Sequence, residues 1–267
     1  MLSAKGLHLR FGELQVLDDV SLDIPVGQFT ALIGANGCGK TTLLNVLARM
    51  QPADAGEVWL DGRPQGQYSR RDLARRLALL PQHTGSPAGM SVRELVVQGR
   101  FPWQGWWRPW SERDQQAVDQ AVSLAGVESL LERSLATLSG GQLQRCWIAM
   151  TLAQDTPVIL LDEPTTFLDI AHQIALLELL GHLREQGRTI VAVLHDLNQA
   201  ARYADHLVMM RKGQLLAQGA PKDVFTRDNL KATFDLDAHI ITDPYSGDPL
   251  CVPMTVQARR AVVEKVS

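Results

Sequence analysis

The 267-residue sequence lacks the features that mark several common classes of protein. Its three cysteines have no paired spacing, which argues against a disulfide framework and fits a reducing compartment. The longest apolar runs, such as residues 190–194, are far shorter than the ~20 residues that cross a bilayer, and the first residues do not resemble a signal peptide. Lys and Arg number 26 against 29 Asp and Glu, so the formal charge of −3 gives no polycationic character suited to nucleic acid. We expect a cytosolic protein that can still dock on an embedded partner.

Apolar residues make up 45% of the chain, and their pattern predicts an α/β fold with a sizeable core. Short strand-like segments fill the first part of the sequence, as in an antiparallel β lobe. The apolar run at 29–33 leads directly into a helical pattern at 40–50. Residues 84–154 are mainly helical, with Ser91 and Ser111 in position to cap two of the helices. The sequence therefore predicts a helical subdomain inserted into a strand-rich core.

The second half resumes the strand pattern. Two runs rich in β-branched residues and leucine, 158–161 and 189–194, flank a helical pattern at 170–184 and predict a parallel βαβ unit. Lys212 and Gly213 lie between two short apolar stretches and predict a hairpin.

The patterning weakens after residue 220, where three prolines interrupt it. We expect one or two short helices there and no site. The predicted organisation is one domain over residues 1–240, followed by a C-terminal tail at 241–267.

A glycine-rich segment at residues 34–41 matches GxxxxGK[ST] and stands between a predicted strand and a predicted helix. Glycine lets backbone N–H groups approach anionic oxygens, and the helix N-terminus adds a favourable dipole. Lys40 would supply a charge for the β- and γ-phosphates of a nucleotide, and the Thr41 hydroxyl would bind Mg²⁺. The alternative is a chance glycine-rich turn, which the strand and helix on either side disfavour. The candidate nucleotide-binding residues of the loop are Gly34, Asn36, Gly37, Cys38, Gly39, Lys40, Thr41 and Thr42.

Two adjacent acids, Asp162 and Glu163, follow the apolar run at 158–161. Neighbouring side chains of a strand point to opposite faces, so the pair can divide its work. Asp162 would hold Mg²⁺ beside Thr41, and Glu163 would polarise the attacking water. The alternative is a strand-end turn with two solvated acids, which the phosphate loop disfavours.

Further segments, in order along the chain, resemble the motifs of the ABC-type ATPases. The segment LSGGQ at 138–142 resembles the signature motif of that family. Gln82 resembles its Q-loop glutamine, Asp169 its D-loop aspartate, His195 its switch histidine and Phe11 its adenine-stacking aromatic residue. The resemblance covers residues 3 to about 240 and implies a P-loop NTPase core with an antiparallel β lobe and an inserted helical subdomain.

The resemblance also implies a mechanism. ATP is bound in a head-to-tail homodimer, with each nucleotide between the Lys40 loop of one copy and the signature loop of the other. His195 would bind the γ-phosphate, and Gln82 would approach Mg²⁺. The nucleotide-binding residues that the family pattern adds are Ser139, Gly140, Gly141, Gln142 and Asp169.

Two residues depart from the commoner family pattern. Phe11 replaces tyrosine, which keeps a π-face for stacking but loses the hydroxyl. Cys38 lies beside Lys40 and a helix N-terminus, conditions that lower the pKa of a thiol. We therefore expect a thiol reagent to block nucleotide binding at Cys38. The alternative is an inert small residue that fills the loop.

Longer phrases indicate the type of ABC protein. Segments at 92–96, 144–150, 165–173 and 194–205 are similar to the ATPases of ferric-siderophore, haem and vitamin B12 importers. A chain with one cassette and no membrane span would need polytopic permease subunits and, indirectly, a substrate-binding protein. The resemblance favours a ferric-siderophore importer ATPase, peripheral on the cytoplasmic face of the inner membrane. The alternatives are a haem or vitamin B12 importer, or a soluble ABC ATPase that is not part of a transporter.

Two clusters are candidates for contacts with the membrane subunit or the membrane. Residues 101–110 contain four of the six tryptophans, which we expect to be divided between the core of the helical subdomain and an interface with the permease. Four arginines in the segment 70–76 are expected to form a solvated helix face, with lipid headgroups as the alternative. The tryptophans are Trp103, Trp106, Trp107 and Trp110, and the arginines are Arg70, Arg71, Arg75 and Arg76.

Overall fold

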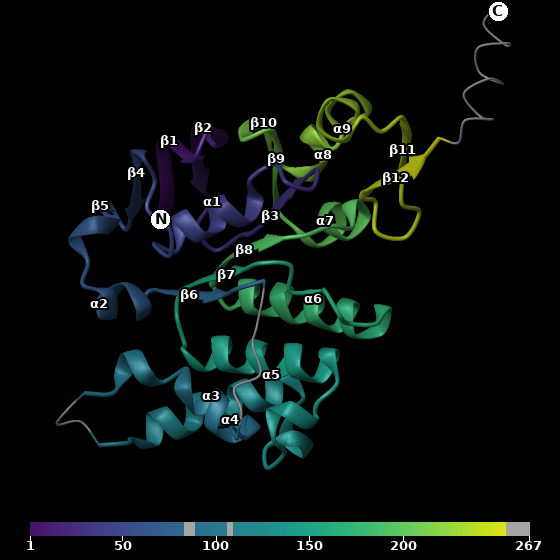
Figure 1. Cartoon of the computed structure of the whole chain (residues 1–267). Coiled ribbons are helices and arrows are strands. Elements are labelled where there is room, and N and C mark those ends of the chain that lie inside the picture. The colour runs from purple at the N-terminus through teal and green to yellow at the C-terminus, as the bar shows by residue number, and fades with distance from the viewer. Residues whose placement is uncertain (83–88, 106–108, 255–267) are drawn as a thin grey trace, which may run out of the picture.

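The computed structural model describes residues 1–82, 89–105 and 109–254 (Figure 1). The strands are β1 Leu2–Phe11, β2 Leu14–Ile24, β3 Phe29–Gly34, β4 Ala55–Leu60, β5 Arg63–Pro64, β6 Leu77–Leu80, β7 Val158–Leu161, β8 Thr189–Val193, β9 His206–Arg211, β10 Gln214–Gly219, β11 Ala238–Thr242 and β12 Pro249–Pro253. The helices are α1 Lys40–Leu47, α2 Arg70–Ala74, α3 Val92–Gln98, α4 Glu112–Ala125, α5 Gly140–Ala153, α6 Ile170–Glu185, α7 Leu197–Tyr203, α8 Pro221–Val224 and α9 Arg227–Phe234. The α/β class is confirmed, and so is the predicted hairpin, which is formed by β9 and β10.

A six-stranded sheet with the order β10-β9-β3-β8-β7-β6 forms the centre of the molecule. Strands β7 and β8 pair in parallel and are connected through α6, which confirms the predicted βαβ unit. Because side chains alternate along a strand, β3 contributes to both faces. Leu32 packs in one core with α1 and the strands of the β lobe, whereas Ala31 and Ile33 pack in the other with the helices α3–α7. The sheet is buried on both faces, which explains its almost continuous apolar strands.

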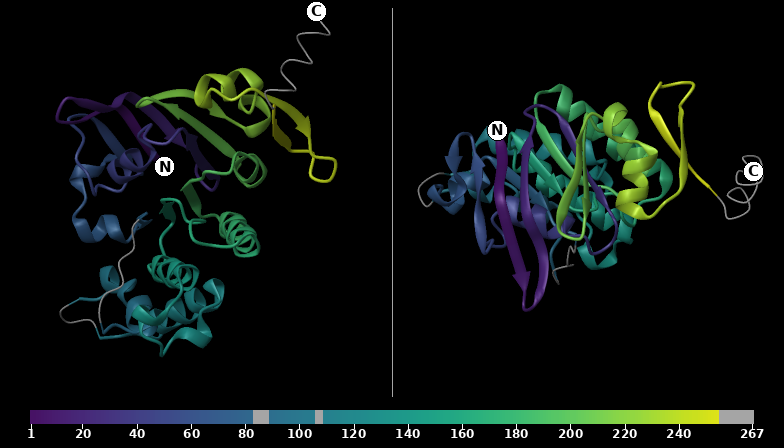
Figure 2. Two further views of the ribbon diagram at one scale, coloured as in Figure 1. Left: turned by 45° about the vertical axis from the view of Figure 1, so that its right-hand side comes forward. Right: turned by 90° about the horizontal axis from the view of Figure 1, so that it is seen from above.

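The β lobe is a four-stranded antiparallel sheet with the order β2-β1-β4-β5. It lies across α1 from the central sheet, and the hairpin β11–β12 lies on the opposite side of the molecule (Figure 2). The end of β1 brings Phe11 to the rim of the lobe, where its side chain is 53% exposed.

The helical subdomain contains α3, α4 and α5, as predicted, and lies below the central sheet in Figure 1. Ser91 and Ser111 cap α3 and α4 in capping boxes, which confirms both cap assignments. A buried ion pair fixes the subdomain from inside: Arg100 Nη2 lies 2.9 Å from Asp114 Oδ1, and both side chains are 1% exposed. Arg100 Nη1 also donates to the carbonyl of Ala153 at the end of α5. One guanidinium therefore joins the ends of three helices.

The C-terminal region differs from the prediction. The expected short helices are present as α8 and α9, but β11 and β12 then form an antiparallel hairpin, with Ala238 and Cys251 buried. The predicted domain boundary at residue 240 falls inside β11. Two of the three prolines, Pro249 and Pro253, stand at the ends of β12, where a two-stranded hairpin tolerates them, and Pro244 lies in the turn between β11 and β12. The hairpin packs against α7, so it is a folded element and not a tail.

Within the described residues, every helix is too short or too polar to cross a membrane.

Candidate functional site

The glycine-rich loop joins β3 to α1, as predicted, and its shape depends on particular glycines. A Cβ on Gly34 would lie 2.3 Å from the carbonyl oxygen of Met210, and one on Gly39 would lie 2.7 Å from that of Val16. Gly39 also has φ 104° and is the N-cap of α1, a conformation that disfavours any other residue. The backbone can therefore pass this close to β9 and β2 only with glycine at these positions.

Lys40 points back into the loop. Its side chain is buried, and Nζ donates to the carbonyl oxygens of Gly34 at 2.7 Å and Ala35 at 3.2 Å. Nζ also lies 3.9 Å from Cys38 Sγ. A buried ammonium group held by neutral groups of its own loop favours an anion beside it. Together with the N-terminus of α1, this geometry suits a phosphate group.

Asp162 lies at the end of β7 beside the loop and is 2% exposed. The Thr41 hydroxyl donates to its Oδ1 at 3.0 Å. Burial, together with the nearby charge of Glu163, raises the pKa of Asp162 to about 6, although the hydrogen bond from Thr41 opposes the shift. A hydroxyl and a poorly compensated carboxylate in contact are a donor set that suits Mg²⁺. The structure thus brings together two of the three predicted metal-binding residues, and Gln82 lines the same cleft.

Glu163 follows Asp162 in a left-handed backbone conformation with φ 52°. This turn aims its carboxylate at His195, whose Nε2 lies 2.7 Å from Glu163 Oε1. Partial burial acts to raise the pKa of Glu163, but hydrogen bonds from His195 and Gln82 outweigh burial and hold that pKa below its ordinary value. Glu163 is thus an ionised carboxylate, with the two other predicted catalytic residues, His195 and Gln82, in contact with it.

A cleft of about 550 Å³ unites most of the predicted site residues. Phe11 forms one wall, which is the position that the stacking prediction requires. The cleft is also lined by Asn36, Gly37, Cys38, Gly39, Lys40, Thr41, Thr42, Gln82, Glu163 and His195.

The predicted residues of the signature motif and the D-loop lie elsewhere, around a second cavity of about 560 Å³. Ser139 is the N-cap of α5, in a capping box with Gln142, so α5 begins at Gly140, slightly before residue 142, where the sequence pattern predicts the start of this helix. Asp169 caps α6 and accepts a hydrogen bond from the backbone N–H of His172. The cavity is lined by Ser139, Gly140, Gly141, Gln142, Arg145, Phe167, Leu168, Asp169 and His172. One chain therefore carries two separate surfaces, each with part of the predicted nucleotide site.

The prediction for Cys38 is wrong in its premise. The thiol is 4% exposed, and burial raises its pKa, although Lys40 acts in the opposite direction. The sequence shows the nearby cation and the helix N-terminus but not how deeply the thiol is buried between β3 and α1. The alternative, a small residue that fills the loop, fits the structure better.

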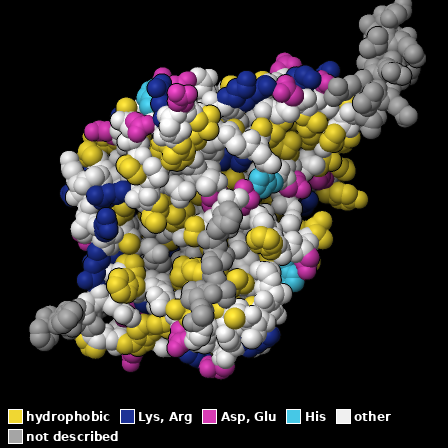
Figure 3. All heavy atoms as spheres, in the orientation of Figure 1, with side chains coloured by type: hydrophobic (Ala, Val, Ile, Leu, Met, Phe, Trp, Pro, Cys, Tyr) yellow, Lys and Arg dark blue, Asp and Glu magenta, His cyan; other side chains and the backbone are white. Residues whose placement is uncertain are grey.

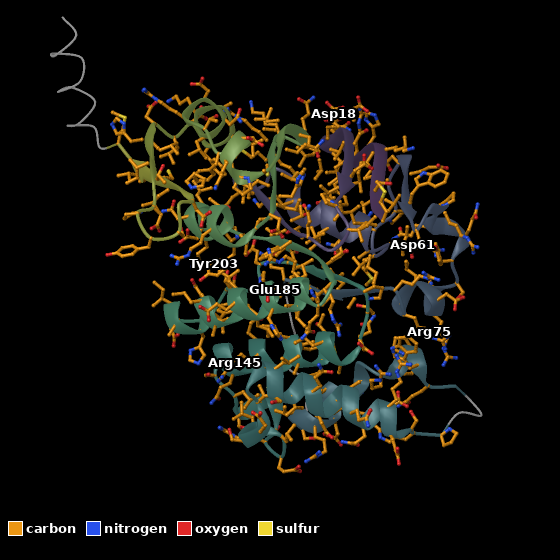
Figure 4. All side chains as sticks on the ribbon, turned by 180° about the vertical axis from the view of Figure 1, so that it is seen from behind. Asp18, Asp61, Arg75, Arg145, Glu185 and Tyr203 are labelled. Carbon is orange, nitrogen blue, oxygen red and sulfur yellow. The ribbon has the colours of Figure 1, made fainter. Side chains whose placement is uncertain are left out.

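The aromatic and basic clusters next to α2 are partly structural. Trp103 donates to the carbonyl of Gln154 at 2.7 Å and stacks with Arg75 and Arg100, whereas Trp110 is 40% exposed. Trp106 and Trp107 lie outside the described residues. Figure 4 shows Arg75 between α2 and the helical subdomain, where Arg71 and Arg75 both donate to the carbonyl of Pro102. Basic side chains also appear along the edge of the molecule near α2 (Figure 3).

Sequence reasoning missed three polar residues that support the site. Thr166 Oγ1 donates to Glu163 Oε2 at 3.3 Å, and Gln144 Nε2 donates to the Pro164 carbonyl at 3.2 Å. Gln173 binds carbonyls of the same turn. The only sequence signal was their place within the signature and D-loop segments, because each acts on main-chain or side-chain atoms brought near by folding.

A P-loop between β3 and α1, a pair of adjacent acids after β7 and a capped LSGGQ turn together define an ATP-binding cassette. The family model described as ABC transporter matches residues 17–166, more than half of the 267 residues. The chain belongs to this family and is an ATPase.

Particular relatives are similar over almost their whole length. The ferric enterobactin transport ATP-binding protein FepC of Escherichia coli (strain K12) is 49% identical, and the match covers 95% of this chain and 94% of that protein. The hemin import ATP-binding protein HmuV of Thermobifida fusca (strain YX) is 40% identical over 95% of this chain and 89% of that protein.

Solved structures show the same fold. An inward-facing putative metal-chelate type ABC transporter superposes with a TM-score of 0.80 at 29% identity, covering 96% of this chain and 98% of that one. A dimeric ATP-binding cassette in a post-hydrolysis state, bound to ADP and Pi, superposes with a TM-score of 0.74 at 26% identity, covering 82% of this chain and 98% of that one.

Proposed function

We propose that the chain is the ATP-hydrolysing subunit of a bacterial importer for ferric siderophores. It would act as a homodimer on polytopic permease subunits at the cytoplasmic face of the inner membrane, and a substrate-binding protein would deliver the cargo. The observation that carries the proposal is the 49% identity with a ferric enterobactin transport protein over 95% of this chain. The hemin import relative is less similar, at 40%.

The geometry supports a dimeric mechanism. The cleft beside Lys40 and the cavity beside Ser139 are separate in one chain, and a solved cassette of this fold that holds ADP and Pi is dimeric. Main-chain amides at the N-terminus of α5 would complete the binding of a triphosphate held by the partner's Lys40 loop.

Hydrolysis would then depend on Glu163 and His195. In the present arrangement the carboxylate of Glu163 binds the imidazole directly. A triphosphate in the cleft would draw His195 to its γ-phosphate and free the carboxylate for a water molecule. Glu163 would accept the proton of that water as the water attacks phosphorus and ADP leaves. Mg²⁺, held by Thr41, Asp162 and Gln82, would neutralise charge on the phosphates.

A growth test on single iron sources addresses the cargo. A strain that lacks the gene should fail to grow on ferric siderophore as the sole iron source, and the wild-type gene should restore growth. The Lys40→Ala gene should not restore growth, because it removes the phosphate-binding ammonium group. Failure on haem alone would instead identify a haem importer, and normal growth on every iron source would contradict the proposal.

Two variants test the site itself. Glu163→Gln should bind ATP, stop hydrolysis and accumulate as an ATP-bound dimer on a sizing column. Ser139→Arg should bind ATP as a monomer but fail to dimerise, because the larger side chain blocks the N-terminus of α5. Normal turnover by Glu163→Gln would rule out Glu163 as the base.

A further inference from the structure

The turn between the acid pair and α6 is held from outside by Gln173. Its Nε2 donates to the carbonyl oxygen of Leu168 at 3.1 Å and to that of Thr165 at 3.3 Å. Gln173 is half-buried in the first turns of α6, so its amide stands over the turn that connects Glu163 to Asp169. One side chain thus fixes both ends of the segment 165–168.

This segment needs an external support. Phe167 has φ 67°, a left-handed conformation that costs energy for a bulky residue and persists only where surrounding contacts impose it. Phe167 is 73% exposed, so packing of its side chain does not impose the conformation. Within the segment, the amide of Leu168 bonds to the carbonyl of Thr165 at a long 3.3 Å. The two bonds from Gln173 therefore restrain both ends of the segment, in addition to the buried side chain of Leu168.

The segment also sets the spacing between the two halves of the site. An added Cβ on Gly140 would meet Phe167 Cβ at 3.5 Å, and one on Gly141 would meet the Phe167 carbonyl at 3.1 Å. The strained turn therefore lies directly against the signature glycines. At its other end, the hydrogen bond from Thr166 to Glu163 ties the turn to the carboxylate of the base.

Gln173 is in turn bound to the helix that follows His195. Gln199 Nε2 on α7 donates to Gln173 Oε1 at 3.0 Å. The preceding residue, Asn198, anchors α7 to the hairpin: its Oδ1 accepts from the amide of Cys251 at 2.7 Å, and its Nδ2 donates to the carbonyl of Cys251. Hydrogen bonds therefore run from the hairpin through α7 and α6 to the turn beside Glu163.

We infer that Gln173 is a positioning residue that keeps the base, the switch histidine and the signature glycines of one chain in register. It sets turnover without taking part in binding nucleotide to the monomer. Its effect on turnover rests on the proposed dimer, in which the signature surface meets the nucleotide of the other copy.

The test compares four variants of the purified full-length chain. Gln173→Leu keeps the volume but removes the donors, and Gln173→Glu keeps an acceptor for Gln199 but replaces the donors by a carboxylate. Gln199→Leu removes only the link to α7. The matched control is Gln186→Leu at the C-cap of α6, where the exposed side chain forms a hydrogen bond with His182.

We expect Gln173→Leu and Gln173→Glu to lower kcat about tenfold, while monomer affinity for ATP changes by less than about twofold. Gln199→Leu should lower kcat less, and Gln186→Leu should match the wild type. The ratio of kcat for Gln173→Glu to that of the wild type should rise as the pH falls, because a protonated glutamic acid regains one donor. A purely structural role would not produce that recovery.

Several outcomes would overturn the inference: a kcat for both Gln173 variants within about twofold of the wild type, an equal loss in Gln186→Leu, or a parallel loss of ATP affinity. If a Gln173 variant does not fold, Gln199→Leu tests the same hydrogen-bond network in its place.

Each variant is also made in the Glu163→Gln background, and its dimerisation with ATP is measured on a sizing column. If Glu163→Gln alone does not dimerise, the proposed function fails; if it dimerises and the Gln173 variants turn over normally, only this inference fails.

Discussion

Removing the guanidinium of Arg100 should destabilise the protein strongly. Arg100→Met keeps most of the side-chain volume but leaves the Asp114 carboxylate buried at 1% exposure without its cation. Breaking a buried pair in this way costs about 3–5 kcal/mol. The Ala153 carbonyl also loses its donor from Arg100, and a buried acceptor left without a donor costs a further ~1–3 kcal/mol. We expect the free energy of unfolding in urea, followed by circular dichroism, to fall by several kcal/mol.

The same subdomain supplies a matched control. Arg93 pairs with Glu132 at 2.7 Å, but the two side chains are 50% and 78% exposed. Water screens this pair, so Arg93→Met should cost less than about 1 kcal/mol. A double variant, Arg100→Met with Asp114→Asn, removes the uncompensated charge and should recover part of the loss. Equal costs for Arg100→Met and Arg93→Met, or no recovery in the double variant, would refute the reasoning.

The nucleotide cleft gives three further tests. Because burial raises the pKa of Cys38, its alkylation at neutral pH should be at least about tenfold slower than in the unfolded chain, as followed by mass spectrometry; equal rates would contradict this. Phe11→Ala should weaken ATP binding about tenfold in calorimetry through lost stacking, whereas Phe11→Tyr should leave it unchanged, and equal losses would exclude stacking. Because the pKa of Asp162 is raised to about 6, the carboxylate is mostly ionised at pH 7 and mostly protonated at pH 5. Mg²⁺-dependent nucleotide binding should therefore weaken about tenfold more over this range in the wild type than in Asp162→Asn, and parallel curves would refute the assignment.

The sequence predicted the phosphate loop and the acid pair well, because both lie at strand ends where the motif and the apolar run coincide. The helix caps at Ser91 and Ser111 were predictable for a similar reason: the capping box is local and its partners are three residues apart. Features that depend on a few neighbouring residues are visible in sequence.

Features that depend on contacts between distant segments could not be predicted from the sequence. The hairpin β11–β12 has no long apolar strand, and it is held in place by its packing on α7. Because this packing is not visible in the sequence, the prolines led to the prediction of a tail. The burial of Cys38 comes from strands that fold over the loop. The supports from Gln144 and Gln173 act on backbone carbonyls of another segment, and no residue pattern marks them.

The separation of the Lys40 cleft from the Ser139 surface has a genetic consequence. If two copies assemble head to tail, one subunit with Lys40→Ala and another with Ser139→Arg would place both defects in the same composite site and leave the other intact. Two inactive alleles could then complement each other in a merodiploid cell, whereas a single allele with both lesions would damage every site it enters.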